Sequence, residues 1–241
     1  MKSAIVTGAS RGIGEAAAKR LAADGFAVVV NYAGNAALAE KIVKEIVTKG
    51  GKAVAVKADI SNETDVATLY AETKKAFGRV DVVVNSGGIM TNALMAAGNF
   101  ADFDRTIAVN LRGTYLMMMG AALNMEKGGR FIALSSSVLH RNLPSYGAYV
   151  ASKAGVEGLV RVFANEMRGR DITVNAVAPG PVATELFLDG KSKEQVEQIA
   201  KQAVMERLGT PEDIAGVISF LAGPDAGWVH GQIIRANGGF G

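Results

Sequence analysis

The sequence predicts an α/β fold, a doubly wound, seven-stranded parallel sheet with helices on both faces. Short apolar runs alternate with longer helical patterns along the whole chain. The apolar runs are rich in Val, Ile and Ala and show little polar alternation, which is typical of strands buried on both faces of a parallel sheet. No Pro- or Ser-rich linker, internal repeat or low-complexity segment divides the 241 residues. We therefore expect a single domain over residues 1–241.

Each element follows from its own pattern. The apolar runs predict strands at residues 3–7, 27–31, 52–57, 80–85, 129–135, 172–178 and 232–236. Helical patterns fill the gaps at 13–24, 36–49, 63–77, 103–125, 149–168 and 211–221. Asn62 and Asp102 are expected N-caps, and Pro211 suits a first helical turn. Three glycines suit helix C-termini: Gly25, Gly50 and Gly78.

The segment 185–205 lies outside this alternation. Its apolar residues follow an amphipathic pattern that predicts one or two short helices: Leu186, Phe187, Leu188, Val196, Ile199, Ala203 and Val204. Periodicity leaves two interpretations open. The segment is either a packed surface excursion or a lid over a ligand.

Composition excludes several classes of function. The formal charge is only +3 with acids and bases well mixed, so we expect no nucleic-acid partner. The absence of cysteine excludes disulfides and thiolate chemistry, and the two histidines, His140 and His230, are too far apart in sequence to predict a metal site. No apolar run reaches the roughly 18 residues that span a bilayer. The first residues lead directly into a strand, so we expect no targeting segment and a cytoplasmic protein.

A glycine-rich turn follows the first predicted strand and opens a helix. It reads Thr-Gly-Ala-Ser-Arg-Gly-Ile-Gly over residues 7–14. Gly8 suits the tight turn, Gly12 lets backbone amides approach an anion, and Gly14 allows close packing of strand and helix. The helix N-terminus offers unpaired N–H groups to a pyrophosphate. This context predicts dinucleotide binding in a Rossmann-type fold, and the lack of a Gly-Lys-Ser/Thr ending excludes a P-loop.

A second motif lies near the middle of the chain. Tyr149 and Lys153 are four residues apart, which places both side chains on one face of a helix. A phenol is a poor acid or base at neutral pH, and an adjacent ammonium lowers its pKa. The pair is therefore suited to moving a proton on and off an alcohol or carbonyl oxygen. By itself the spacing is weak evidence, because it occurs by chance in many helices.

Together the two motifs resemble the short-chain dehydrogenase/reductase family, and the resemblance covers essentially the whole chain. Further family motifs have counterparts in the same order. Asp59 matches the acid that contacts the adenine, and residues 84–88 match the stretch after strand four, although Ser86 and Gly87 replace the usual Asn-Ala. Residues 179–184 match the segment that wraps the nicotinamide, and Asn237 stands where most members have Asp.

The resemblance implies hydride transfer between a nicotinamide and a carbonyl or secondary alcohol. It implies a catalytic tetrad of four residues: Asn110, Ser136, Tyr149 and Lys153. Tyr149 would move the proton, Ser136 would hydrogen-bond the substrate oxygen, and Lys153 would lower the pKa of Tyr149 and hold the nicotinamide ribose. Asn110 would hold a water that connects the lysine to solvent. Ser135 and Ser137 flank Ser136, and spacing favours Ser136.

The expected cofactor is NADP(H) rather than NAD(H). A carboxylate at the end of strand two would select NAD through the ribose hydroxyls, and residues 30–34 contain no acid. Arg11 is placed to meet a 2′-phosphate, although it could instead be a solvated loop residue. The expected cofactor-binding residues are Gly8, Ser10, Arg11, Gly12, Ile13, Gly14, Asn31, Tyr32, Asp59, Ile60, Asn85, Ser86, Gly87, Tyr149, Lys153, Pro179, Gly180, Val182 and Thr184.

The substrate is harder to predict from the sequence than the cofactor. The sequence resembles the 3-oxoacyl-(acyl-carrier-protein) reductases and related carbonyl reductases, which implies reduction of a β-keto thioester or ester, or a medium apolar ketone. The implied pocket edge is Leu139, Asn142, Leu143, Tyr146, Leu186 and Phe187. Lys127 and Arg170 match positions of carrier-protein contacts, so acyl-carrier protein is a possible partner. The same analogy implies a homotetramer, in which the methionines at 117–119 would form either a contact or core.

Two other functions stay open at this stage. An NAD-dependent dehydrogenase of a sugar or secondary alcohol would use the same catalytic residues. A nicotinamide-binding regulatory protein should have lost at least one member of the tetrad, and all four are present. The cofactor preference and the turnover of a Tyr149→Phe variant separate these alternatives.

Overall fold

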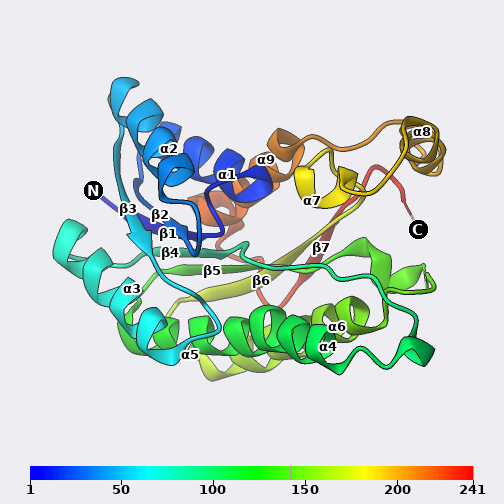
Figure 1. Cartoon of the computed structure of the whole chain (residues 1–241). Coiled ribbons are helices and arrows are strands. Elements are labelled where there is room, and N and C mark those ends of the chain that lie inside the picture. Colours follow the sequence, from blue (N-terminus) through cyan, green and yellow to red (C-terminus); the bar gives the residue numbers. More distant parts are fainter. Residues whose placement is uncertain (142, 241) are drawn as a thin grey trace.

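The computed structural model describes residues 1–141 and 143–240. Within these residues, seven parallel strands form one sheet in the order β3-β2-β1-β4-β5-β6-β7 (Figure 1). The strands are β1 (Ser3–Thr7), β2 (Ala27–Tyr32), β3 (Lys52–Lys57), β4 (Val82–Asn85), β5 (Arg130–Leu134), β6 (Thr173–Pro179) and β7 (Ile233–Ala236). The predicted fold class is confirmed, and the predicted bounds of β1 and β3 match the structure residue for residue.

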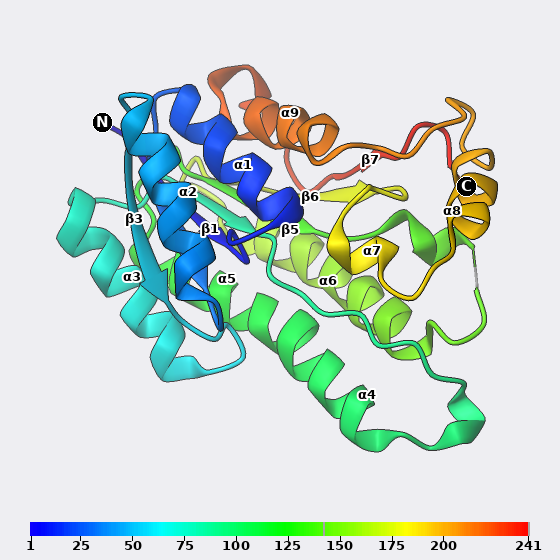
Figure 2. The same cartoon turned by 45° about the horizontal axis from the view of Figure 1, so that its top comes forward.

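Helices cover both faces of the sheet. On one face lie α1 (Gly12–Ala23), α2 (Ala36–Thr48) and α9 (Pro211–Ala222), and on the other lie α3 (Glu63–Phe77), α5 (Gly113–Asn124) and α6 (Gly147–Glu166) (Figures 1 and 2). Each layer buries its own hydrophobic cluster against the sheet. Val29 and Val83 face the α3–α5–α6 layer while Val28 and Val82 face the other, because successive strand residues point to opposite faces.

The helix predicted at 103–125 differs from the structure. The structure has α4 (Phe100–Thr106), a π-helical turn (Ile107–Arg112) and then α5. Asn99, not Asp102, is the N-cap: its Oδ1 accepts a hydrogen bond from the Asp102 N–H at 3.2 Å. Asn99 and Asp102 both carry side-chain oxygens that can cap a helix. Asn99 comes first in the chain and accepts the hydrogen bond from an unpaired backbone N–H of the first turn. The other predicted cap, Asn62, does cap α3.

The strand order determines where a ligand can bind. The chain runs from β1 outward to β3, then crosses back to β4 and continues to β7 in the opposite direction. The loops after β1 and β4 therefore diverge to opposite faces, which opens a crevice at their carboxyl ends. The segment predicted at 185–205 folds as α7 (Glu185–Leu188) and α8 (Lys193–Ala200), and both short helices lie at this edge of the sheet (Figure 2).

Candidate active site

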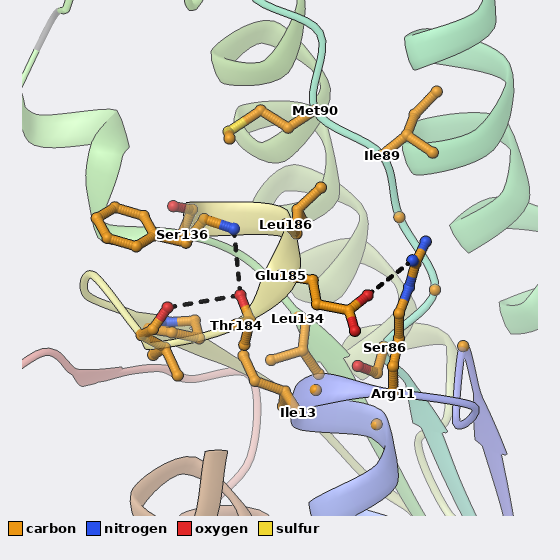
Figure 3. Close-up of a pocket in the computed structure, with 18 of the residues that line it drawn as sticks. Arg11, Ile13, Ser86, Ile89, Met90, Leu134, Ser136, Thr184, Glu185 and Leu186 are labelled. Carbon is orange, nitrogen blue, oxygen red and sulfur yellow. Dashed lines mark hydrogen bonds and ion pairs between the residues drawn. The ribbon is translucent and has the colours of Figure 1, made fainter. Parts of the chain in front are cut away.

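A cavity of about 880 Å³ opens at the carboxyl ends of the strands. Its lining joins the glycine-rich turn after β1, the loops after β2, β3 and β4, the end of β5, the start of α6, and the segment from β6 to α8. Figure 3 shows Thr184 beside Ile13 of the glycine-rich turn, and Arg11 directed at Glu185. Residues that are far apart in sequence thus share one site.

The glycine-rich turn can approach a ligand only because it lacks side chains. Gly8 has a φ of 60°, and a Cβ there would lie 2.8 Å from the Cα of Gly87. A Cβ at Gly14 would lie 2.4 Å from the carbonyl oxygen of Gly8. The N-cap of α1, Arg11, makes no side-chain capping bond, so the first N–H groups of this helix are available to an anion. These features fit a dinucleotide pyrophosphate.

Buried polar side chains hold this turn in place. The Oδ1 of Asn31 accepts a hydrogen bond from the Gly8 N–H at 3.3 Å, and its Nδ2 donates to the carbonyls of Val56 and Ala58. The Thr7 hydroxyl donates to Asn85 Oδ1 at 2.9 Å. Asn31 lines the cavity, and its amide side chain supports the glycine-rich turn through both its oxygen and its nitrogen.

Arg11 lies on the rim with its guanidinium directed at the helix α7. Its Nη1 lies 3.1 Å from Glu185 Oε2, and both side chains are largely exposed (Figure 3). Residues 33–35 after β2 contain no acid, and the carboxylate partner of Arg11 comes from α7. The ion pair connects the glycine-rich turn to α7 across the mouth of the cavity.

Tyr149 and Lys153 project from the first half of α6. The Lys153 ammonium is buried, donates to the Leu134 carbonyl at 2.7 Å, and lies 5.7 Å from the centre of the Tyr149 ring. Burial lowers the pKa of Lys153 to about 8. Burial also raises the pKa of Tyr149 to about 12, and the neighbouring Ser136 hydroxyl lowers it only in part. Desolvation thus outweighs the Ser136 hydrogen bond at Tyr149, and the expected lowering of the tyrosine pKa by Lys153 stays a prediction.

Ser136 is the serine whose hydroxyl faces Tyr149. Its Oγ accepts a hydrogen bond from the Val138 N–H at 3.3 Å, which leaves its own O–H free to donate. The flanking hydroxyls are engaged elsewhere: Ser135 donates to Glu157 at 2.7 Å, and Ser137 donates to the Ala178 carbonyl at 3.0 Å. The structure thus favours Ser136 by geometry as the sequence does by spacing.

Asn110 lies in the π-helical turn behind these residues. Its Oδ1 accepts from the Ile89 N–H and its Nδ2 donates to the Ile89 carbonyl, both at 2.8 Å. Nδ2 also donates to Ser152 Oγ at 3.1 Å, and Ser152 donates to the Tyr149 carbonyl. The side chain therefore fixes the loop after β4 to the catalytic helix. Its expected role as a water-holding group stays a prediction.

The whole chain matches known proteins. A family model described as enoyl-(acyl carrier protein) reductase matches residues 8–241. An NADPH-dependent aldehyde reductase-like protein of Arabidopsis thaliana is 43% identical over 98% of this chain and 93% of its own length. A 3-oxoacyl-(acyl-carrier-protein) reductase of Staphylococcus aureus is 41% identical over 99% and 97%. A short-chain dehydrogenase of Burkholderia cenocepacia solved with NADP superposes with a TM-score of 0.93 at 33% identity, covering 99% and 97%.

The chain belongs to the short-chain dehydrogenase/reductase family. It is an oxidoreductase of that family. In this short-chain dehydrogenase/reductase, Ser136, Tyr149 and Lys153 line the cavity directly, while Asn110 is buried beside them. The structure also brings most of the expected cofactor residues to the lining: Gly8, Ser10, Arg11, Gly12, Ile13, Gly14, Asn31, Asp59, Ile60, Ser86, Gly87, Pro179, Gly180, Val182 and Thr184.

Some expected site residues do not reach the cavity. Tyr32 packs on the core layer of α1 and α2, because it is the last residue of β2 and points to that face. Asn85 is buried below the floor, where its amide bonds Thr7 and Thr114. Val138 lines the cavity in place of Leu139. Asn142 lies outside the described residues.

The substrate side of this short-chain dehydrogenase/reductase is mostly apolar. Leu143, Tyr146, Leu186 and Phe187 line it as expected. Ile199, which belongs to the amphipathic pattern of the segment 185–205, lines this side from α8. Sequence reasoning missed three further residues of this side, Met90, Gln202 and Phe240, which lie outside helices and strands and which no local pattern marks. The segment 185–205 covers one side of the cavity, and its closing motion stays a prediction.

The structure bears on two positions considered for partner contacts. Arg170 donates to the carbonyls of Ala122 and Met125 at the C-terminal end of α5, so its guanidinium also supports the fold, and its contact with a carrier protein stays a prediction. Met117 and Met118 are core residues and only Met119 is exposed. Within residues 1–141 and 143–240, no three His, Asp or Glu side chains gather as a metal site. No helix in that described part is both long and apolar enough to cross a membrane.

Proposed function

We propose that this protein is an NADP(H)-dependent reductase that converts an apolar aldehyde, ketone or β-keto thioester to the alcohol. One observation carries the proposal. A single cavity joins the Arg11 end of the glycine-rich turn to Ser136 and Tyr149, and its far side is lined by apolar side chains. Small-molecule sites commonly combine such an apolar lining with a few convergent polar groups.

The chemistry follows from the protonation states. A bound NADPH would supply hydride to the carbonyl carbon. Ser136 has an O–H free to donate to the substrate oxygen, which positions that oxygen and stabilises its developing charge. Tyr149 is protonated at neutral pH because its pKa is raised to about 12, so it carries the proton that the reduced oxygen needs.

Three observations support NADP(H) over NAD(H). Arg11 lies at the rim, no acid follows β2, and Asn31 is committed to the turn. The A. thaliana relative is named as NADPH-dependent, and the B. cenocepacia structure contains NADP. An NAD-dependent sugar or secondary-alcohol dehydrogenase is the competing function, and faster turnover with NADH than with NADPH would favour it.

Partners beyond the small-molecule substrate are also proposals. Apolar side chains are exposed on α5 and α6, namely Tyr115, Met119, Leu123 and Val162, and we propose that they contact other copies in a homotetramer. Light scattering from the purified protein tests this assembly. An acyl-carrier protein would use Lys127 and the part of the Arg170 guanidinium that does not bond α5. The cytoplasmic location expected from the sequence stays a prediction.

The first experiment is NADPH oxidation with two substrates, a medium-chain aldehyde and an acetoacetyl-pantetheine thioester. Saturable turnover of either one supports the proposal, and the ratio of kcat/KM values shows which class is preferred. A protein that binds NADPH tightly but turns over neither substrate would contradict it. The same assays with NADH measure the cofactor preference.

A further inference from the structure

The far wall of the cavity is built by the turn after β7. Phe240 is only 5% exposed and lines the cavity together with Ile199 and Gln202 from the end of the lid segment. None of these residues belongs to the glycine-rich turn or to the catalytic tetrad. In both views, the chain after β7 lies near α8, on the side of the molecule away from α2 (Figures 1 and 2).

The backbone of the turn that carries Phe240 is held by several hydrogen bonds. The Phe240 N–H donates to the Asn237 carbonyl at 3.0 Å, and the Phe240 carbonyl accepts from Asn237 Nδ2 at 2.8 Å. The Gly238 carbonyl accepts from the Met205 N–H at 3.0 Å, which connects this turn to the segment 185–205. These bonds fix the backbone position from which the Phe240 ring enters the cavity wall.

Arg141 connects the ring to the lid. Its guanidinium carbon lies 4.8 Å from the centre of the Phe240 ring, in a cation–π contact, and its Nη2 donates to Gln202 Oε1 at 2.7 Å. Arg141 directly follows the 3₁₀ turn Ser137–His140, which begins next to Ser136. The Arg141 side chain thus connects the turn that follows Ser136, the segment 185–205 and the turn after β7.

We propose that Phe240 is the end wall of the substrate pocket and sets the longest apolar chain that the enzyme accepts, with Arg141 as its positioning residue. The inference rests on the proposed function. An apolar substrate whose carbonyl oxygen lies at Ser136 and Tyr149 extends its chain toward the face lined by Leu186 and Phe187, and it ends against the Phe240 ring. The ring offers no hydrogen-bond donor or acceptor, so the chain end that it accepts is apolar.

The test measures kcat/KM with NADPH for straight-chain carbonyl substrates of increasing length. In Phe240→Ala the preferred length moves to longer chains, and each methylene newly accommodated raises kcat/KM about fourfold, because burying one is worth about 0.8 kcal/mol. Phe240→Leu gives a smaller move in the same direction, and Phe240→Trp shortens the preferred chain. Phe220→Ala is the matched control, because Phe220 lies half-exposed on α9 outside the cavity.

Arg141 has its own readout. Arg141→Ala frees the ring and broadens the length preference, whereas Arg141→Lys keeps a cation over the ring and restores most of the selectivity. A merely structural role would lower kcat/KM equally at all lengths. Circular dichroism and NADPH affinity, both expected to be unchanged, show that each variant is folded.

The outcomes separate the inference from the proposed function. If the wild type turns over the series and both Phe240→Ala and Phe240→Leu keep its length preference, the inference is overturned while the function stands. If the wild type binds NADPH but turns over no carbonyl, the proposed function is overturned. Calorimetric titration with secondary alcohols of the same lengths, in the presence of NADP⁺, then decides the inference by whether Phe240→Ala shifts the length that binds most tightly.

Discussion

At the scale of single residues, the electrostatics of the site depend on burial more than on neighbouring charges. Tyr149 and Lys153 share one face of α6, yet burial favours the neutral form of each side chain. Burial raises the pKa of Tyr149 to about 12 and lowers the pKa of Lys153 to about 8. The phenol keeps its proton at neutral pH. The lysine is the group whose charge changes in the range where the enzyme can be assayed.

Removing the phenolic oxygen should abolish most of the turnover. In Tyr149→Phe we expect kcat to fall by about 10² or more, because a positioned acid contributes roughly 10²–10⁴. NADPH affinity, measured by fluorescence titration, should stay within about twofold. Tyr115→Phe, at an exposed tyrosine of α5, is the control and should keep full activity. Unchanged turnover in Tyr149→Phe would remove the assigned role.

Lys153 should make stability depend on pH. Its folded-state pKa of about 8 lies below the usual value of 10.5, so between these values the unfolded chain binds more protons. The free energy of unfolding therefore rises as pH increases from about 8 toward 10.5. The raised pKa of Tyr149 acts in the opposite direction only above about 10.

Urea unfolding at pH 7.5 and 9.5 measures this contribution. The wild type should gain more stability between the two pH values than Lys153→Met, which has no group to titrate. The difference between the two proteins isolates Lys153 from other titrating groups. Equal gains would show that the ammonium is not desolvated as the structure indicates.

At the scale of elements, a break in helical regularity between α4 and α5 positions Asn110. The π-helical turn between α4 and α5 shifts the register of the helix at Asn110, and π-bulges often occur at functional sites. The Gly113 N–H there reaches back to the Ala108 carbonyl. A regular 3.6-residue pattern predicted one uninterrupted helix, because the apolar spacing on either side of the turn is compatible with it.

The contact between α7 and the glycine-rich turn gives a prediction at this scale. Glu185 holds Arg11 at 3.1 Å, so a 2′-phosphate must compete with this carboxylate. Glu185→Gln should lower KM for NADPH by up to about fivefold, the range of an exposed ion pair, without changing KM for NADH. Glu194→Gln, at an exposed carboxylate of α8, is the control. A parallel change in both KM values would mean that Arg11 does not contact the 2′-phosphate.

At the scale of the whole molecule, two helical layers hold the sheet whose carboxyl edge carries the site. The layer of α3, α5 and α6 packs closely enough that Gly120 of α5 meets the ring of Tyr70 from α3. A Cβ at Gly120 would lie 2.2 Å from this ring, and the Tyr70 hydroxyl donates to the Met117 carbonyl at 2.6 Å. The Tyr70 ring is thus confined by the α5 backbone and by the hydrogen bond of its own hydroxyl, so moving it away from Gly120 would cost free energy.

Gly120→Ala should therefore lower the free energy of unfolding by about 1–3 kcal/mol, the usual cost of overpacking. Gly158→Ala is a matched control in α6, because nothing lies within 4 Å of the added Cβ. Replacing that helical glycine should leave stability unchanged or raise it by up to about 1 kcal/mol. Urea unfolding of both variants measures the difference. Equal stabilities would show that the α3–α5 contact is looser than the structure indicates.

Much of the fold and of the candidate site could be predicted because their signals are local. Apolar runs of Val, Ile and Ala mark strands buried on both faces, and their alternation with helices indicates a doubly wound parallel sheet. The glycine-rich turn and the Tyr149–Lys153 spacing are each contained within a few residues. Their placement at one cavity follows from the strand order, in which the chain crosses from β3 back to β4 beside β1.

The sequence by itself determined the fold class, the family and the residues expected to carry the chemistry, because spacing and side-chain type act over one strand or one turn of helix. Only the tertiary structure decided that Phe240, Ile199 and Gln202 line one side of the cavity, and that Arg170 bonds the end of α5. It also decided that burial outweighs the Ser136 hydrogen bond at Tyr149. These properties depend on loop paths and on the solvent that surrounding segments exclude, and no local pattern encodes either one.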